Sequence, residues 1–153
     1  MAVTPLDTSI AELASTANHR TLGVWAADCA ERALPCFEEG YPEDSRPRQA
    51  IEALRAWLQT GVFRMADVRR TSLAAHAAAR EVEADDAARS AARAAGQALA
   101  TAHVPGHAVA AAIYAATAVR DTTDSPDADA ATVKERNWQY QHLLGLVEDS
   151  NPT

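Results

Sequence analysis

The stretch DAARSAARAAGQALATAHVPGHAVAAAIYAATAV, residues 86–119, decides the fold of this chain. Alanine, arginine and leucine are strong helix formers, so the stretch favours helix from end to end. As one helix it would be about 50 Å long, which exceeds the width of a compact domain of this size. Pro105 removes a backbone hydrogen bond and disfavours helix at Val104. The stretch therefore predicts two helices, one beginning at Asp85-Asp86 and one over about 106–119, with a break at 104–105.

The rest of the chain has the same character. Alanine supplies 37 of the 153 residues and glycine is scarce, so strands have little support. Apolar residues at three- and four-residue spacing predict the other helices. These cover about 8–17 with Asp7 or Thr8 as the cap, 21–39, Pro47 to a stop at Gly61, 64–83 and 128–148. The predicted fold is all-α, a compact bundle of about six or seven short alanine-rich helices. We expect one domain over 1–153 with its core at about 20–148 and frayed termini.

Helical wheels predict which faces are buried. Leu73 defines the inner face of the helix over 64–83, with Arg69, His76 and Arg80 near the same line. Val62 continues the inner face of the preceding helix. The last helix carries Val133, Asn137, Tyr140, Leu144 and Val147 on one face.

Cys29 and Cys36 would lie about 10 Å apart on one helix, too far for a disulfide unless Pro35 breaks the helix early. Free, small core thiols suit a reducing compartment. The N-terminal segment MAVTPLDTSIAEL lacks the basic and apolar regions of a secretion signal, and no apolar window is long enough to span a membrane. We therefore expect a cytoplasmic protein without membrane association.

The formal net charge of −7 is unevenly spread. Residues 1–45 carry eight acids against two bases, and residues 121–153 carry seven against two, whereas residues 46–93 carry nine arginines against six acids. An acidic protein is a poor ligand for nucleic acid and a plausible partner for a basic protein. Solubility alone is the simpler explanation of the charge.

The chain has no recognisable catalytic signature. A nucleophile elbow, a phosphate-binding glycine loop and a dinucleotide fingerprint are all absent, so no cofactor is expected and an enzymatic role is uncertain. Asp28 beside Trp25 would have a raised pKa if it were buried, as general acids and bases often do. An ion pair between Asp28 and Arg32, one turn along the helix, is the alternative.

The remaining polar candidates are histidines and arginines. Arg93, Gly96 and His103 fall on one line of their helix, and the small residue leaves room for a ligand between the other two. His103 and His107 have the i,i+4 spacing of metal ligands, but no third ligand has a diagnostic spacing and Pro105 threatens the geometry. Paired core or helix-end histidines are the alternative to a metal site.

Several segments resemble a bacterial family, common in actinobacteria, that is described as immunity protein-like. The resemblance covers about residues 21–144 and is carried by RPRQAIEALRAW, ATAHVPGH and ERNWQ, beginning at Arg46, Ala100 and Glu135. It implies a protein that binds and blocks a cognate toxin, with an acidic surface meeting a basic toxin. Residues shared across the resemblance include Asp28, Arg46, His76, Arg80, Arg93, His103, His107, Arg136 and Trp138.

Two hypotheses follow. In the first, the protein binds a basic toxin through an exposed acidic helical surface, and His76 and His103 are buried and inert. In the second, it is a small-molecule-binding, self-resistance or catalytic protein of natural-product metabolism with a closed pocket inside the bundle. There His76, His103 or Asp28 would act as acid or base, and the ligand would be held by Arg80, Arg93, His107 and Trp138. The alanine-rich faces also make a homodimer plausible.

Overall fold

Eight helical segments and their connections make up residues 3–150, the part of the chain described by the computed structural model. The prediction of an all-α fold is confirmed. The helices are α1 (Pro5–Thr16), α2 (His19–Ala33), α3 (Pro35–Glu38), α4 (Arg46–Thr60), α5 (Met65–Glu81), α6 (Asp86–Ala100), α7 (His107–Asp121) and α8 (Ala128–Ser150). Among these residues, no helix is both long and apolar enough to cross a membrane.

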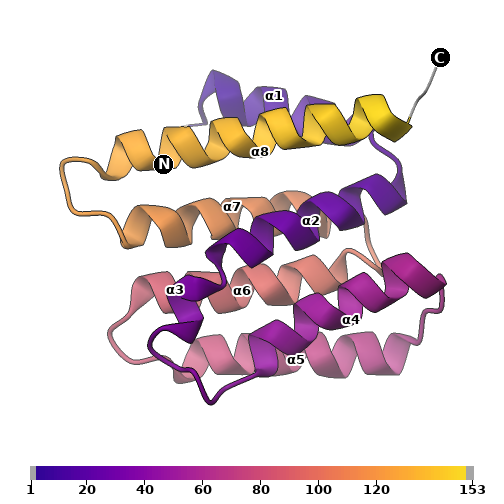
Figure 1. Cartoon of the computed structure of the whole chain (residues 1–153), viewed down its shortest axis with the longest axis horizontal. Helices are drawn as coiled ribbons and strands as arrows, with labels where there is room; N and C mark the ends of the chain where they lie inside the picture. Colours follow the sequence, from indigo (N-terminus) through magenta and orange to yellow (C-terminus); the bar gives the residue numbers. More distant parts are fainter. Residues whose placement is uncertain (1–2, 151–153) are drawn as a thin grey trace.

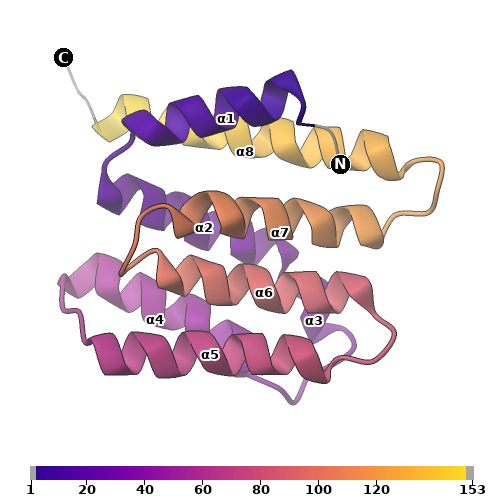
Figure 2. The ribbon, with the colours of Figure 1, turned by 180° about the vertical axis from the view of Figure 1, so that it is seen from behind.

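The helices form two layers. In Figure 1, α8, α2 and α4 lie towards the viewer. Figure 2, from behind, shows α1, α7, α6 and α5 side by side as the second layer. Helix α6 is central, because it packs against both neighbours in its own layer and against α2, α3 and α4 of the other.

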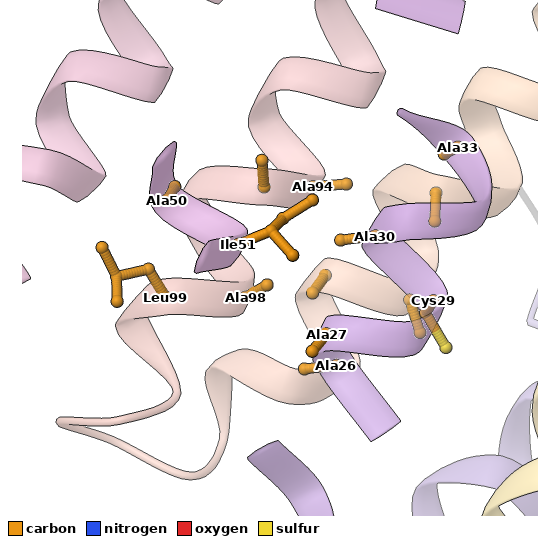
Figure 3. Packing of buried hydrophobic residues seen from close by; sticks show 14 of the residues in the cluster. Ala26, Ala27, Cys29, Ala30, Ala33, Ala50, Ile51, Ala94, Ala98 and Leu99 are labelled. Carbon is orange, nitrogen blue, oxygen red and sulfur yellow. The ribbon is translucent and has the colours of Figure 1, made fainter. Parts of the chain in front are cut away.

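Alanine makes this arrangement possible. Helix α6 buries seven alanines together with Gly96 and Leu99, so nearly its whole circumference is in contact with other helices. Figure 3 shows Ala30 of α2 and Ile51 of α4 meeting Ala94 and Ala98 of α6. Small side chains at such contacts allow the helix axes to approach closely. The core also extends beyond the expected 20–148 range, because Ile10 of α1 is fully buried.

Most helix boundaries agree with the local signals. The break around Pro105 is confirmed, although α6 already ends at Ala100. Gly61 ends α4 with a positive φ of 70°, and the Asp85 side chain accepts a hydrogen bond from the amide of Ala88 at the start of α6. Helix α1 begins earlier than predicted because Thr4, and not Asp7 or Thr8, is its N-cap. The expected fraying of residues 149–153 falls partly on 151–153, outside the described residues.

Three predictions about helices and faces are wrong. The predicted helix over 21–39 is divided into α2 and α3, because Pro35 cannot continue the helical hydrogen bonding. Leu73, taken as the inner position of α5, is 56% exposed, and Val62 is also exposed. Helix α5 instead buries Ser72, Ala75, Ala78 and Ala79.

The face predicted for α8 is wrong in its first half, since Val133 is 52% exposed and Asn137 is exposed. Tyr140 and Val147 of the same face are partly buried and pack against the core. The buried residues of α8 are Glu135, Arg136, Gln139 and Leu143. In an alanine-rich bundle the helix faces with small side chains make the close contacts between helices. Polar side chains are buried where they have hydrogen-bond partners.

Candidate functional site

The candidate residues from the sequence lie in three separate places, of which the turn after α6 holds His103 alone. Asp28 and Trp138 line a groove beside α2 and α8. His76, Arg80, Arg93 and His107 belong to the other layer, on α5, α6 and α7. The closed pocket of the second hypothesis, which required these side chains to converge, is therefore wrong.

The groove on the first layer has a volume of about 320 Å³ and is lined by Asp28, Glu31, Arg32, Trp138 and His142. Asp28 of α2 connects this helix to α4 and α8. Arg55 of α4 donates to its Oδ1 at 3.0 Å, and Nε2 of His142 of α8 lies 2.7 Å from its Oδ2. The predicted Asp28–Arg32 ion pair is wrong, because these tertiary partners take its place.

Arg32 instead reaches α8, where it forms two hydrogen bonds of 2.9 Å to the carboxylate of Glu135. This pairing raises the pKa of Arg32, mainly through the hydrogen bonds to Glu135. The guanidinium also lies 3.9 Å from the ring centroid of Trp138, and His142 stacks on the same indole at 4.7 Å. Sequence reasoning missed Glu135 and His142, because neither has a local partner that would mark it.

A buried polar network fastens α8 to the rest of the bundle. Gln139 is fully buried, and its Nε2 donates to the carbonyl of Ala112 in α7 at 2.8 Å. Its Oε1 accepts from Arg136, which also donates to Asp7 of α1 at 3.0 Å. Trp25 of α2 donates from Nε1 to the Gln139 carbonyl at 2.9 Å. The role of these residues is structural, because their hydrogen bonds join α8 to α1, α2 and α7.

His76 is the centre of a cationic cluster on the second layer. Its half-buried ring lies against Gly96 of α6, and its Nδ1 is buried without a hydrogen-bond partner among residues 3–150. Burial lowers the pKa of His76, and the charges of Arg93, Arg80 and His107 lower it further. His107 is oriented by Gln97, whose Oε1 lies 2.7 Å from Nδ1 of the imidazole.

His103 lies apart from this cluster. It is exposed in the turn after α6, where its ring stacks on Phe63 at 5.9 Å, so the expectation of a buried His103 is wrong. His103 and His107 do not share a helix, and the i,i+4 geometry proposed for a metal is absent. Within the described part of the chain, no group of three or more His, Cys, Asp or Glu side chains is arranged to hold a metal ion.

Both cysteines are free. Cys29 is buried, and burial raises the pKa of its thiol well above the usual value. Burial also raises the pKa of the partly buried Cys36 thiol. Neither has the lowered pKa of a reactive thiol, which fits the expected role of small core residues.

Three loops meet at one end of the bundle (Figures 1 and 2). With the adjoining helix turns they cover residues 38–48, 80–89 and 120–129, which we call the acidic end. These segments hold twelve acidic residues against five arginines, a net charge of −7 that equals the formal charge of the whole chain. The rest of the molecule is therefore neutral overall, and the charge has a definite location.

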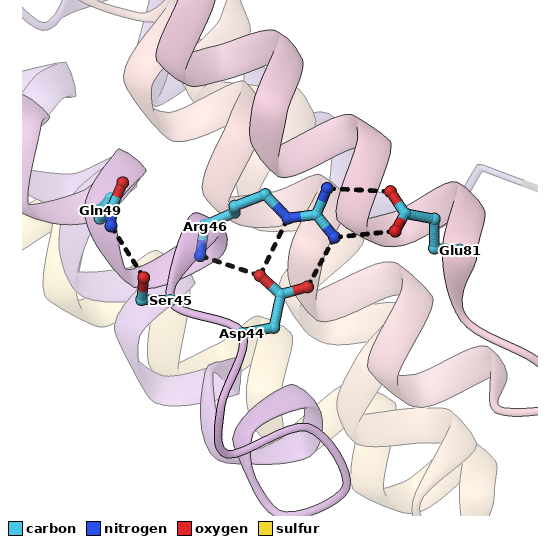
Figure 4. Close-up of polar contacts among 5 residues, drawn as sticks. All are labelled: Asp44, Ser45, Arg46, Gln49 and Glu81. Atoms are coloured by element: carbon cyan, nitrogen blue, oxygen red, sulfur yellow. Dashed lines mark hydrogen bonds and ion pairs between the residues drawn. The ribbon is translucent and has the colours of Figure 1, made fainter.

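Only part of this charge is neutralised internally. Figure 4 shows Arg46 between Asp44 and Glu81, with contacts of 2.7 and 2.8 Å that join two of the loops. Seven further carboxylates of the acidic end form no ion pair within residues 3–150. They are Glu39, Glu43, Glu83, Asp85, Asp121, Asp124 and Asp127. Burial and the nearby charge of Asp86 raise the pKa of Asp121, as expected where like charges gather.

The fold and the charge distribution define a small all-α protein with a concentrated acidic surface and an open polar groove. The chain belongs to a family described as Imm-5 like putative immunity protein, whose model matches residues 12–146. No curated protein and no solved structure matches the chain.

Proposed function

We propose that this protein is an immunity protein that binds a basic toxin through the acidic end and thereby neutralises it. The observation that carries the proposal is the concentration of the full net charge in three adjoining loops. Membership of the family indicates that the partner is a protein, because an immunity protein acts on another protein.

The unpaired carboxylates are suited to such a role. A carboxylate with an internal partner gains little from a toxin arginine, whereas an unpaired and hydrated one can form a new charge-assisted hydrogen bond. Clustered like charges also attract an oppositely charged partner over several ångströms, which accelerates encounter and excludes partners of the wrong sign. In the isolated protein the carboxylates of the acidic end repel one another, and a basic partner would remove this repulsion.

The partner is identified first. The tagged protein is purified gently from its own host and analysed by native mass spectrometry. We expect a single basic protein in simple stoichiometry that inhibits growth when it is expressed alone and loses this effect when the present protein is coexpressed. An acidic partner, or a partner without toxicity, would contradict the proposal.

Charge reversal then tests the surface. One variant replaces Glu43, Glu83 and Asp124, one exposed acid from each loop, with lysine. A matched control replaces Glu12, Glu52 and Glu148, exposed acids outside the acidic end, so that both variants change the net charge equally. We expect the first variant to lose the partner and protection from the toxin, while the control retains both. Equal behaviour of the two variants would show that the acidic end is not the interface.

A further inference from the structure

The three helices of residues 65–121 have an unusual distribution of charge. Residues 68–80 and 87–120 contain no aspartate or glutamate at all, although they carry six arginines and three histidines. Arg70, Arg89 and Arg120 pair with acids that lie outside these segments. The other three arginines, Arg69, Arg80 and Arg93, form no ion pair within residues 3–150. The two segments make up most of α5, α6 and α7, which lie side by side in Figure 2.

Arg80 and Arg93 flank, along their helices, the contact between His76 of α5 and Gly96 of α6. Because α5 and α6 are antiparallel neighbours, Arg80, one turn after His76, and Arg93, one turn before Gly96, lie on the same side of that contact. His107 approaches from α7 on the other side of α6, held by Gln97. The charges of Arg93, Arg80 and His107 each lower the pKa of His76.

No carboxylate of the described chain forms an ion pair with Arg80 or Arg93. The carboxylate of Glu81 does sense the charge of Arg80, but both of its oxygens are bound by Arg46, at 2.8 and 3.1 Å. The cluster thus has donors and positive charge in excess of its acceptors, together with an imidazole Nδ1 that has no partner.

We propose that His76, Arg80, Arg93 and His107 form a binding site for a small, multiply charged oxyanion, a phosphate or diphosphate group. Guanidinium groups match such oxyanions because each can donate two parallel hydrogen bonds. Gly96 belongs to the site because any side chain there would displace the imidazole ring that lies against it. The site is on the layer opposite the α2–α8 groove, and Arg80 places one edge of it next to the acidic end.

The ligand is a small molecule and not a nucleic acid. The cluster is small, and the acidic end on the same chain would repel an extended polyanion. The two classes give opposite outcomes in the following experiment.

Sodium pyrophosphate is titrated into the ¹⁵N-labelled protein at constant ionic strength, balanced with sodium chloride, while the ring signals of His76 and His107 are followed by NMR. We expect saturable shifts at both rings, with the pKa of His76 rising in the complex. Citrate in a parallel titration distinguishes carboxylate from phosphate ligands, and tighter binding of citrate would overturn the phosphate assignment. Tighter binding of a single-stranded oligonucleotide would overturn the small-ligand assignment.

Variants test the geometry. Arg93→Gln and Arg80→Gln should each weaken pyrophosphate binding about tenfold, the loss typical of one charged hydrogen-bonding group. Arg93→Lys should retain more affinity than Arg93→Gln because it keeps the charge. The control is Arg70→Gln on α5, whose arginine is exposed and already paired with Asp67 at 2.9 Å. Unsaturable shifts at His76 in the wild-type protein, or equal losses in Arg93→Gln and Arg70→Gln, would overturn the proposal.

Discussion

Replacing Gly96 with alanine tests the contact on which the packing of α5 against α6 depends. A Cβ atom at this position would lie 2.7 Å from Nε2 of His76 and 2.9 Å from both Cδ2 and Cε1. Favourable separations between non-bonded carbon atoms are about 3.5–4.0 Å, so the new methyl group overlaps the ring by up to about 1 Å. The ring or the helix must move.

The expected free-energy change has two parts of opposite sign. Overpacking a well-filled contact costs about 1–3 kcal/mol. Alanine in place of glycine within a helix stabilises by about 1 kcal/mol. Gly96→Ala should therefore destabilise the protein by up to about 2 kcal/mol, whereas the same substitution in a His76→Ala background should stabilise it by about 1 kcal/mol, because the overlap is gone.

The assay is equilibrium urea denaturation followed by circular dichroism, with an unchanged m value as the check that the unfolding transition is comparable. Gly145→Ala is the matched control, because a Cβ at this position in α8 has no atom within 4 Å. It should stabilise the protein by about 1 kcal/mol. If Gly96→Ala in the wild-type background stabilised as much as Gly145→Ala, the proposed seating of His76 on Gly96 would be refuted.

Two further substitutions probe buried polar groups. Gln139→Leu removes one hydrogen bond each from the Arg136 guanidinium and the Ala112 carbonyl and should destabilise by about 2–4 kcal/mol in urea denaturation, whereas Gln141→Leu on the exposed side of α8 should have almost no effect. His76 has a pKa below its ordinary 6.5 in the folded state, so the unfolded chain binds its proton more readily and stability should fall as pH decreases from 7 towards 5.5. His76→Gln should lose less stability over this interval than the wild type, and equal losses would contradict the assignment.

Local chemistry explains why most helices could be predicted. Pro105 interrupts helical hydrogen bonding wherever it lies, and Gly61 adopts a positive φ at low cost, so both breaks follow from the residues themselves. Pro35 is the instructive exception. Helix α2 ends before Pro35, but Leu34 between α2 and α3 keeps helical backbone angles. The apolar spacing therefore continues across the boundary, and the sequence pattern does not reveal it.

Buried faces were harder to predict because a helical wheel assigns the interior by side-chain size. Leu73 is the largest apolar residue on its helix face but points to solvent, since the close approach of α5 to α6 admits only Ser72, Ala75 and similar small residues. On α8 the predicted face did not include Gln139. Its burial depends on Ala112 and Arg136, partners that only the assembled bundle supplies.

The sequence by itself determined the helical class, the main interruptions of the helices and the net charge of −7, because these depend on residues and their near neighbours. Only the tertiary structure decided where that charge lies. Antiparallel packing brings every second connection to the same end, so loops far apart in the chain unite their carboxylates there. The packing of the helices also separates Asp28 and Trp138 from His76 and Arg93. The fit between helix faces with small side chains decides which helices become neighbours.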